Sequence, residues 1–309
     1  MKLLLLGANG QVGWQLRRSL STIGDVVALD AHSTQYCGDV TSAAGIEATI
    51  DAVRPAVIVN AAAYTAVDKA EADATSAMAI NGTACETLAS AAARTQAWLV
   101  HFSTDYVYDG TGEAPWVETD APRPLSVYGQ SKLAGDLAIQ ARAPRHLILR
   151  TSWVFDTWGN NFLKSILKAA LTREELTIVD DQWGAPTRAA LIADVAAVAL
   201  RTVLASPNPD PLAGVYHLAA GGATTWYRYA LLALDEARRL GIPVRVKPDR
   251  VRRTSSSEYP SVAHRPRNSR LNTAKLQRTF DICLPAWEDG VHAVVAELAH
   301  QAGLLTTTT

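Results

Sequence analysis

The first thirteen residues constrain the fold more than any other stretch of the 309-residue sequence. Residues 2–6 form a continuous apolar run, which is typical of a strand buried on both faces. The turn Gly7-Ala-Asn-Gly10-Gln-Val-Gly13 follows, and residues 14–20 have helical character. Strand, glycine turn and helix predict the phosphate-binding corner of a dinucleotide fold, because glycines let the backbone approach a pyrophosphate and the helix N-terminus offers amide donors. The spacing is G-x-x-G-x-x-G rather than G-x-G-x-x-G.

The next two apolar runs extend the same nucleotide fold. Residues 25–29 end in Asp30, about 20 residues past the glycines, where an acidic side chain accepts hydrogen bonds from the adenosine ribose. Asp30 should repel a 2′-phosphate, so we expect NADH to be usable, while His32 and Ser33 leave room for NADPH. Residues 56–59 run into asparagine and three alanines, whose small side chains leave space for a cofactor at the carboxyl end of the strand.

A tyrosine and a lysine four residues apart are the best candidates for chemistry. Tyr128 and Lys132 fall in residues 126–142, which read as helix, so both side chains lie on one helix face. A free tyrosine has a pKa of about 10, and a neighbouring cation lowers it. Lowering it by about three units takes roughly 4 kcal/mol, which one charge at ~4 Å supplies when the effective dielectric constant is near 20. The pair is therefore sufficient for proton transfer to a carbonyl oxygen.

The strand before that helix supplies a third polar group. Residues 98–102 form an apolar run that leads into Ser103, Thr104 and Asp105. A serine or threonine at a strand end, followed by Tyr-x-x-x-Lys on a helix behind an N-terminal nucleotide fold, resembles the short-chain dehydrogenase/reductase superfamily. The glycine spacing resembles its extended branch. The resemblance implies an α/β fold, with a Rossmann-type doubly wound parallel sheet and a smaller C-terminal substrate-binding domain.

The alternation of strand and helix loosens beyond residue 150. We therefore expect residues 1–150, with return segments near 187–220, to form the dinucleotide-binding domain. Residues 151–300 should form mainly the substrate-binding domain. The basic segment 264–270 in that part carries arginines, which bind a diphosphate bidentately when they lie near a cleft.

Seven stretches spread over nearly the whole chain narrow the resemblance from the superfamily to one of its families. Together they are similar to the dTDP-4-dehydrorhamnose reductase family, which catalyses the last step of dTDP-L-rhamnose synthesis. The stretches are residues 7–13, 59–70, 103–108, 128–135, 150–154, 180–187 and 265–272. The resemblance implies NADPH- or NADH-dependent reduction of the C4 ketone of dTDP-4-dehydro-β-L-rhamnose, which gives dTDP-β-L-rhamnose.

The resemblance also implies the catalytic roles. Tyr128 gives the proton to the new hydroxyl, and Lys132 lowers the pKa of the tyrosine and holds the nicotinamide ribose. Thr104 hydrogen-bonds the ketone oxygen as charge develops on it, the stabilisation that matters most in such a step. Residues 67–93 read as helix, which residues 81–83 interrupt, and the resemblance implies that Asn81 would help to anchor a water or the lysine.

The remaining site residues rest on the same resemblance. Residues of the glycine turn, of the second strand's end and of the alanine segment would bind the cofactor together with the catalytic tyrosine and lysine. They are Gly7, Asn9, Gly10, Gln11, Val12, Gly13, Asp30, Gly38, Asp39, Val40, Ala62, Ala63, Tyr64, Thr65, Tyr128 and Lys132. The dTDP-sugar would meet Thr104, Asp105, Trp153, Asn161, Gln182 and Arg265, and Trp153 would cover the sugar.

No metal site is expected. Some members of the family bind magnesium at a dimer contact through glutamates, and the matching positions here are Gln15, Ala190 and His292. These residues make a poor set for a hard cation that prefers oxygen ligands. A homodimer stays open, but a metal-bridged one is not expected.

Two other classes of function stay open. The nearest is another nucleotide-sugar reductase, epimerase or dehydratase of the same fold. A dehydratase needs two adjacent carboxyls beside the threonine, and here Asp105 is followed by Tyr106. The other class is a catalytically silent binding subunit, against which the presence of Tyr128 and Lys132 argues. The sequence also leaves open the opposite C4 configuration of the product, a 6-deoxy-L-talose nucleotide.

Composition limits the partners and the compartment. A formal net charge of −1 gives no reason to expect a nucleic acid or an anionic membrane as partner. Cys37, Cys85 and Cys283 lack metal-ligand spacing. A sparse, odd set of cysteines with no apparent secretory leader is typical of reduced thiols in a cytosolic protein. No apolar run approaches ~18 residues, so we expect a cytoplasmic protein without a membrane span.

Overall fold

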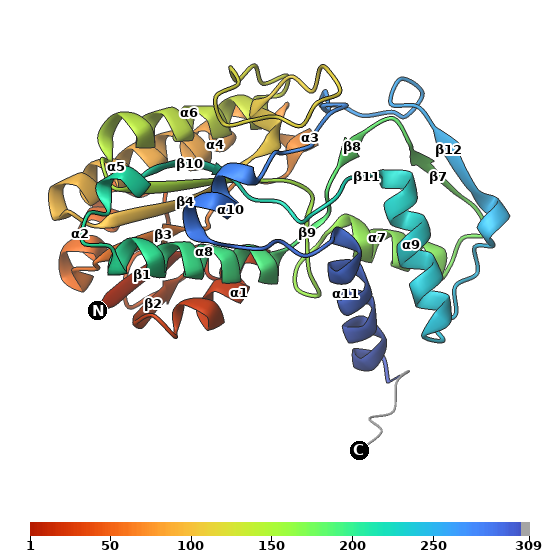
Figure 1. The fold of residues 1–309 in the computed structure, drawn as a ribbon, viewed down its shortest axis with the longest axis horizontal. Coiled ribbons are helices and arrows are strands. Elements are labelled where there is room, and N and C mark those ends of the chain that lie inside the picture. The colour runs from red at the N-terminus through yellow and green to blue at the C-terminus, as the bar shows by residue number, and fades with distance from the viewer. Residues whose placement is uncertain (304–309) are drawn as a thin grey trace.

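The computed structural model describes residues 1–303, and a six-stranded parallel sheet runs through its larger half (Figure 1). The strands lie in the order β10-β5-β4-β3-β1-β2. They are β1 (Lys2–Leu6), β2 (Asp25–Leu29), β3 (Val57–Asn60), β4 (Trp98–Thr104), β5 (His146–Thr151) and β10 (Gly214–His217). Chain order reverses at β1, because β2 pairs on one side of it and β3 on the other. Open α/β sheets bind their ligands at the carboxyl ends of the strands beside such a reversal.

Helices cover both faces of this sheet, because side chains alternate in direction along each strand. The odd-numbered leucines of β1 face a core that α1 (Gln11–Leu20) and α8 (Ala189–Ala205) cover. The even-numbered leucines face a second core under α2 (Ala43–Val53), α5 (Ala84–Thr95) and α6 (Val127–Arg142). All four leucines are fully buried, and each contributes about 1.5–3 kcal/mol. The doubly wound α/β class expected from the sequence is confirmed.

A third core lies beyond the sheet, at the right of Figure 1. It is built from α7 (Phe162–Ala170), α9 (Trp226–Arg239) and α11 (Trp287–Gln301) together with β7 (Leu176–Val179) and β12 (Val251–Thr254). The two strands pair in parallel. Its buried side chains belong to neither sheet core, although the partly buried Leu191 packs against both this core and the core under α1 and α8.

Short elements join the two parts. β6 (Val154–Phe155) pairs with β9 (Thr187–Arg188), and β8 (Trp183–Gly184) pairs with β11 (Thr224–Thr225). Helix α10 (Ala274–Phe280) returns to the α1–α8 face of the sheet, where its leucine and phenylalanine are buried. The existence of a separate third core supports a division into two domains near residue 150, which stays our proposal, with α8, β10 and α10 belonging to the first part.

The stretch of residues 67–93 is helical with an interruption at residues 81–83, as expected, and it has a further break at residues 71–73. It is divided into α3 (Val67–Ala70), α4 (Ala74–Met78), a π-helical turn at Ala79–Thr83, and α5. Asp73 caps α4 by accepting a hydrogen bond from the Ser76 N–H at 3.2 Å, which starts a new helix inside the alanine-rich stretch. Strand β12 and helices α10 and α11 were not predicted from the sequence. Single 3₁₀ turns span Asp105–Val107, Asp210–Leu212 and Pro248–Arg250.

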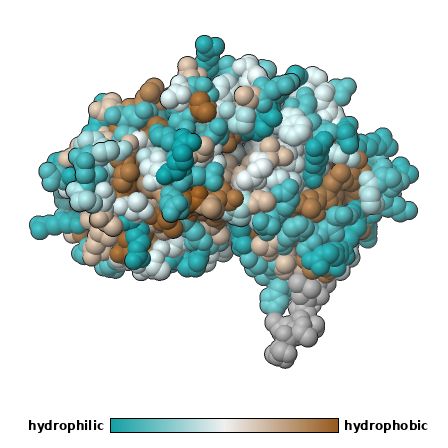
Figure 2. Space-filling view, viewed as in Figure 1, coloured by the Kyte–Doolittle hydropathy of each residue, from teal (hydrophilic) through white to brown (hydrophobic). Residues whose placement is uncertain are grey.

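The surface is largely polar. Figure 2 shows a face on which hydrophilic side chains predominate and apolar ones form separate clusters. Among residues 1–303, no helix combines the length and apolar character that a membrane crossing requires.

Candidate active site

The expected catalytic residues meet where β4 ends and α6 begins. Thr104 is the last residue of β4, and Tyr128 lies in the first turn of α6. Ser126 caps that helix by accepting a hydrogen bond from the Gly129 N–H at 3.1 Å, which sets where the helix starts. A Cβ at Gly129 would lie 2.3 Å from the carbonyl oxygen of Tyr106, so only glycine lets α6 approach the turn after β4.

The Tyr128 phenol is a protonated acid in this structure. Its ring lies edge-on to the ring of Tyr106, with centroids 5.6 Å apart and planes at 75°. Burial raises the pKa of Tyr128, a hydrogen bond with Thr104 opposes the rise, and neighbouring carboxyls add to it. This direction is opposite to the lowering that we expected from Lys132. The phenol therefore keeps its proton at neutral pH, as a proton donor must.

Lys132 has different neighbours from those expected. Its side chain is 1% exposed, and its Nζ lies 2.6 Å from the carbonyl oxygen of Phe102 and 3.1 Å from Nε2 of His101. Burial lowers the pKa of this lysine. The four-residue spacing does place Tyr128 and Lys132 on one side of α6, but the lysine nitrogen is bound to β4. The tyrosine consequently lacks the lowered pKa that the spacing alone suggested.

Asp105 lies directly against Thr104. Its side chain is buried, and Thr104 Oγ1 donates a hydrogen bond to its Oδ1 at 3.1 Å. Its Oδ2 has no hydrogen-bond partner within residues 1–303. Burial raises the pKa of Asp105 to about 7, so this carboxyl exchanges its proton near neutral pH. A buried carboxyl with one unsatisfied oxygen is typical of a functional site.

The glycine turn fits a dinucleotide pyrophosphate. Gly7 has a φ of 76°, and a Cβ on it would lie 2.4 Å from the nitrogen of Ala62, so the turn packs directly on the end of β3. A Cβ on Gly13 would lie 2.0 Å from the Gly7 carbonyl oxygen. Gly10 precedes α1 without a side-chain cap, and the first turn, from Gln11 on, holds no acidic residue. The free amide donors there suit an anion.

Asp30 follows β2 beside this turn. Its carboxylate accepts hydrogen bonds from the side-chain amide of Asn9, from the His32 N–H at 2.9 Å and from Ser33 Oγ at 3.1 Å. The bond from the His32 backbone is the largest cause that lowers the pKa of Asp30. The structure thus brings Asn9 and Asp30 together and keeps a negative charge next to the glycine turn.

The loop after Asp30 is held close behind it. A Cβ on Gly38 would lie 2.2 Å from the Asp30 carbonyl oxygen, so this position also requires glycine. Asp39 Oδ1 accepts hydrogen bonds from the Thr41 N–H at 2.9 Å and from its hydroxyl at 2.7 Å. Val40 is buried under the sheet. The segment therefore lies next to the expected adenosine side of the cofactor site.

Asn81 organises the segment after β3. It lies in the π-helical turn, a feature often found at functional sites. Its Oδ1 accepts from the Tyr64 N–H at 2.9 Å, and its Nδ2 donates to the Tyr64 carbonyl at 3.0 Å and to Ser131 Oγ at 3.0 Å. Asn81 thus ties Tyr64 to Ser131 of α6, the residue that directly precedes Lys132.

Two expected substrate contacts, Gln182 and Arg265, line a pocket of about 370 Å³, whereas Thr104, Tyr128 and Lys132 are not among its lining residues. Gln182 accepts a hydrogen bond from the Trp226 indole at 3.0 Å and donates one to Ser256 at 3.1 Å. Arg265 pairs with Asp68 at 2.6 Å. The pocket therefore offers an aromatic ring, an amide and a guanidinium to a ligand.

Trp153 is held in an unusual conformation next to that pocket. Its φ is 48°, a left-handed value that costs a bulky residue about 1–3 kcal/mol. Its ring stacks on Trp226 with centroids 3.6 Å apart and planes at 15°. A Cβ on Gly184 would lie 2.6 Å from the Trp153 ring, so glycine is needed there. Such strain persists only where packing enforces it, and it is commonest at functional sites.

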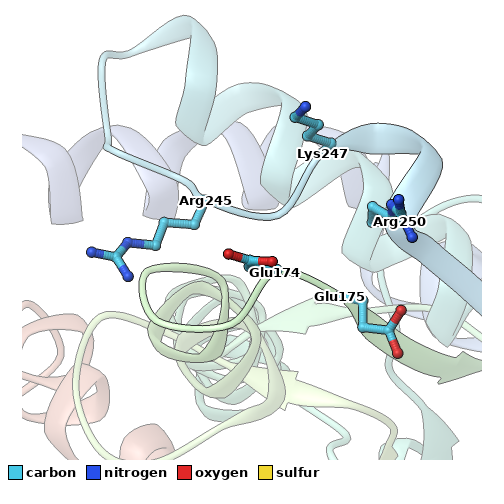
Figure 3. A pocket seen from close by; sticks show the side chains of 5 residues that line it. All are labelled: Glu174, Glu175, Arg245, Lys247 and Arg250. Carbon is cyan, nitrogen blue, oxygen red and sulfur yellow. The ribbon is translucent and has the colours of Figure 1, made fainter.

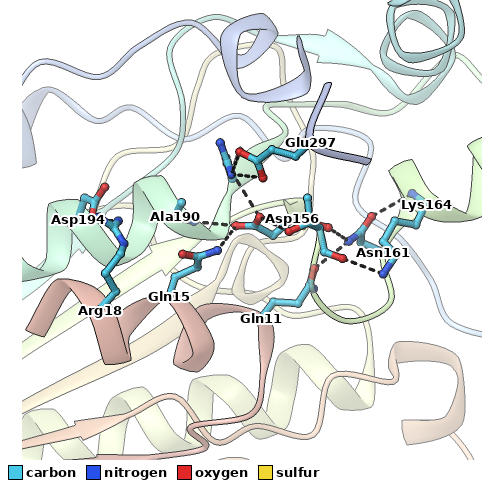
Figure 4. A network of polar contacts seen from close by, with 11 residues as sticks. Gln11, Gln15, Arg18, Asp156, Asn161, Lys164, Ala190, Asp194 and Glu297 are labelled. Carbon is cyan, nitrogen blue, oxygen red and sulfur yellow. Dashed lines mark hydrogen bonds and ion pairs between the residues drawn. The ribbon is translucent and has the colours of Figure 1, made fainter. Parts of the chain in front are cut away.

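Asn161 lies at the cofactor corner. Figure 4 shows a polar network between the glycine turn and the segment that leads into α7. Asn161 caps α7, and its Nδ2 donates to Gln11 Oε1 at 2.9 Å and to the Asp156 carbonyl at 2.7 Å. The buried Asp156 carboxylate accepts from Gln15 Nε2 at 3.2 Å and from the Ala190 N–H at 3.0 Å. Asn161 does not line the 370 Å³ pocket.

The three positions that match the family's magnesium site have other partners. Gln15 and Ala190 both bind Asp156, whereas His292 Nδ1 lies 3.2 Å from the carboxylate of Glu236. Within the part of the chain that the structure describes, no group of three or more His, Cys, Asp or Glu residues could hold a metal ion.

A larger pocket, of about 550 Å³, lies in the outer loops around the third core (Figure 3). Only charged side chains line it, and none of them belongs to the expected site. They are Glu174, Glu175, Arg245, Lys247 and Arg250.

The parallel sheet, the glycine corner and the Thr–Tyr–Lys set define a Rossmann-type oxidoreductase of the extended short-chain dehydrogenase/reductase class. The RmlD substrate binding domain family matches residues 1–300. The dTDP-4-dehydrorhamnose reductase of Salmonella typhimurium is 51% identical over 309 residues, the whole of both chains. That of Burkholderia thailandensis is 43% identical over 302 residues, 97% of this chain and 100% of the other. The chain belongs to the dTDP-4-dehydrorhamnose reductase family, which confirms the resemblance.

The fold of this chain also matches that of a solved structure. The crystal structure of dTDP-4-dehydrorhamnose reductase from Bacillus anthracis in complex with NADP superposes with a TM-score of 0.85 at 30% identity. The match covers 96% of this chain and 99% of that chain.

Several residues near the site were not predicted. Asp68, His101 and Asn60 touch predicted residues, and Tyr106 packs on the catalytic tyrosine. One signal was available for His101, because a polar side chain stood inside the apolar run of a strand buried on both faces. For Asp68 no local signal existed, since its partner is nearly two hundred residues away.

Proposed function

We propose that this chain catalyses the NAD(P)H-dependent reduction of the C4 ketone of dTDP-4-dehydro-β-L-rhamnose to dTDP-β-L-rhamnose. The observation that carries the proposal is the meeting of Thr104 and a protonated Tyr128 at the carboxyl edge of the sheet, between a glycine corner and a pocket with a guanidinium. The relatives that carry this name match the chain from end to end.

Each residue of the site has a chemical task in this reaction. Thr104 Oγ1, which donates to Asp105 Oδ1 at 3.1 Å in the structure, would turn its single proton to the ketone oxygen, and Tyr128 would give that oxygen its proton. The bound NAD(P)H supplies the hydride to the carbonyl carbon. Lys132 holds the nicotinamide ribose and lowers the pKa of Tyr128 once its Nζ leaves the Phe102 carbonyl.

The cofactor is held by this chain's own backbone. The uncapped N-terminus of α1 and the glycine turn take the pyrophosphate, and Asp30 takes the adenosine ribose. Asn81 keeps residues 62–65 in place on the other side of the cofactor. Asp30 favours the free ribose hydroxyls of NADH, whereas the neighbouring His32 and Ser33 leave room for NADPH, so we expect both cofactors to be used.

The substrate nucleotide is assigned to the 370 Å³ pocket. Arg265 suits a diphosphate, since its planar guanidinium binds two oxygens at once. Trp226 offers a flat surface to the base, and Gln182 offers an amide. Trp153, stacked on Trp226, covers the sugar from the same side.

A dehydratase or an epimerase fits the site less well. Elimination of water needs a second carboxyl after Asp105, and that position holds Tyr106, whose ring packs against Tyr128. The set of Thr104, Tyr128 and Lys132 is complete for a ketone reduction.

The test is the stoichiometry of cofactor consumption. Purified protein given the dTDP-keto-sugar should oxidise one NAD(P)H per sugar, with the nicotinamide absorbance falling until the limiting reagent is spent. Conversion of sugar without net oxidation of added cofactor would point to an epimerase or a dehydratase. Binding without turnover would point to a silent subunit. NMR of the product settles its configuration at C4.

A further inference from the structure

Three buried polar side chains surround the buried Lys132, and the proposed reaction does not account for them. Asn60, Cys85, His101 and Lys132 are each at most 1% exposed. They come from β3, α5, β4 and α6, so the fold brings them together from four separate elements. A buried polar cluster of this kind must satisfy its hydrogen bonds internally.

A backbone N–H sets the orientation of the Asn60 side-chain amide. Its Oδ1 accepts a hydrogen bond from the Ala62 N–H at 3.2 Å. With the oxygen held in that way, Nδ2 is the atom that lies 3.2 Å from Nδ1 of His101. An amide nitrogen can only donate, so Nδ1 of His101 must accept.

The tautomer of His101 follows from its contact with Asn60. Burial, together with Lys132, holds the pKa of this histidine well below its ordinary value, so the imidazole is neutral. A neutral imidazole carries one proton, and a ring whose Nδ1 accepts carries it on Nε2. Nε2 is the atom that lies 3.1 Å from the Nζ of Lys132. His101 thus points an N–H at the lysine.

The charge of Lys132 follows from the tautomer of His101. An ammonium has three donors and no acceptor, so it would meet the His101 N–H donor to donor. An uncharged amine has a lone pair that accepts from His101, and it still donates to the Phe102 carbonyl at 2.6 Å. Of these two states, only the amine satisfies both contacts.

The other titratable groups around the lysine do not supply a counter-ion in contact with it. Cys85 from α5 keeps its proton, because burial raises the pKa of its thiol to about 11. Asp136, one turn further along α6, is bound to Arg150 at 3.0 Å. Tyr128, one turn earlier, stays protonated. Burial accordingly lowers the pKa of Lys132, in agreement with the hydrogen-bond geometry.

We propose that Asn60 and His101 are positioning residues for Lys132, and that they hold it in the cofactor-free protein as an uncharged amine that accepts a hydrogen bond from His101 Nε2–H. This deepens the proposed function, because the lysine would gain its charge only when it leaves His101 for the cofactor ribose. The phenol of Tyr128 would then become a stronger acid only in the loaded site.

The test is an NMR measurement on the cofactor-free protein, so it needs no turnover and stands whether or not the proposed reaction is found. Ring ¹⁵N shifts distinguish the two neutral tautomers and the imidazolium. His101, assigned with His101→Gln, should be neutral with its proton on Nε2. The Nδ1–H tautomer or an imidazolium would overturn the proposal.

Two buried histidines of the same chain are internal controls. Nδ1 of His146 lies 2.6 Å from the Ala143 carbonyl, and Nδ1 of His217 lies 3.0 Å from the Trp116 carbonyl. A carbonyl only accepts, so both should carry the proton on Nδ1, opposite to His101.

The variant Asn60→Asp tests whether Asn60 sets the tautomer of His101. In Asn60→Asp the carboxylate still accepts from Ala62, but it also accepts from His101, so the ring proton should move to Nδ1. Nε2 then accepts from a Lys132 ammonium.

A pH titration with lysine ¹³Cε labels measures the protonation midpoint of Lys132. This midpoint should lie below that of surface lysines in the wild type and should rise in Asn60→Asp. Asn81→Asp makes the same charge change near α6 without touching His101, and it should leave the tautomer unchanged. A wild-type Lys132 midpoint equal to that of surface lysines would contradict the proposal even if Asn60→Asp did not fold.

Discussion

Asp68 and Arg265, 197 positions apart in the sequence, form an ion pair of 2.6 Å that joins the segment after β3 to the loop between β12 and α10. Asp68 also accepts a hydrogen bond from the Ala263 N–H at 3.1 Å. Both side chains line the 370 Å³ pocket. Because both are partly exposed, the pair adds little to stability. Its role is to set the guanidinium at the pocket, where a diphosphate would compete with Asp68 for it.

Arg265→Gln should raise the KM for the dTDP-sugar about 10–100-fold, since hydrogen bonds to charged groups contribute ~1.5–3 kcal/mol and ~1.4 kcal/mol is tenfold. The melting temperature should hardly change. Arg267→Gln is the matched control, because Arg267 lies two residues away, is largely exposed and pairs with Asp181 at 3.7 Å outside the pocket. Equal effects of the two substitutions on KM would rule out the assignment of Arg265 to the diphosphate.

Tyr128→Phe should reduce kcat by ~10²–10⁴, the usual contribution of a positioned acid. The binding of NAD(P)H should change little, because the ring and its packing on Tyr106 are kept. Steady-state kinetics and a cofactor titration measure the two effects. Tyr106→Phe removes a neighbouring phenol from the same ring pair and should lose far less activity. Near-normal turnover of Tyr128→Phe would mean that another group gives the proton.

Asp30→Ala should shift cofactor choice toward NADPH, because it removes an acceptor for the ribose hydroxyls and a charge that repels a 2′-phosphate. We expect the NADPH/NADH ratio of kcat/KM to rise by at least about tenfold. Asp25→Ala makes the same charge change at the opposite, amino end of β2 and serves as the control. An unchanged ratio in Asp30→Ala would show that Asp30 is not at the ribose.

Asp105 should make the protein less stable as the pH rises. Its pKa is about 7 in the folded protein, against an ordinary value of 3.8, so between these two pH values the folded state binds more protons than the unfolded state. The free energy of unfolding then falls with increasing pH, and the loss is complete above about pH 7, with a magnitude on the order of 4 kcal/mol. Asp105→Asn, which cannot ionise, should lack this loss.

Urea unfolding of both proteins at several pH values measures that difference. Relative to the wild type, Asp105→Asn should gain stability from about pH 4 to about pH 7 and then stay level. Two curves that run parallel over this range would show that Asp105 is not buried as a neutral acid.

Local pattern in the sequence determined the framework of the protein. Uninterrupted apolar runs mark strands buried on both faces, and Gly7, Gly10 and Gly13 mark the turn between the first strand and its helix, because each of these features depends on neighbours within a few residues. The same reasoning placed Thr104 at a strand end and Tyr128 at a helix start, which is where the structure has them. Membership of the family followed from these motifs taken together.

Only the tertiary structure decided how the side chains of the site are used. The four-residue spacing put Lys132 on the same helix face as Tyr128, but the direction of its Nζ depends on His101 and the Phe102 carbonyl, which belong to another strand. The pKa of Tyr128 followed burial rather than the expected cation.

The placement of contacts between distant segments was decided in the same way. Asn161 lies against Gln11, and Arg265 pairs with Asp68, although each pair is separated by 150 residues or more. Nor could the sequence show that α10 returns to the first sheet. The physical reason is that hydrogen-bond direction and desolvation depend on which segments pack together, and a one-dimensional pattern carries that information only for near neighbours.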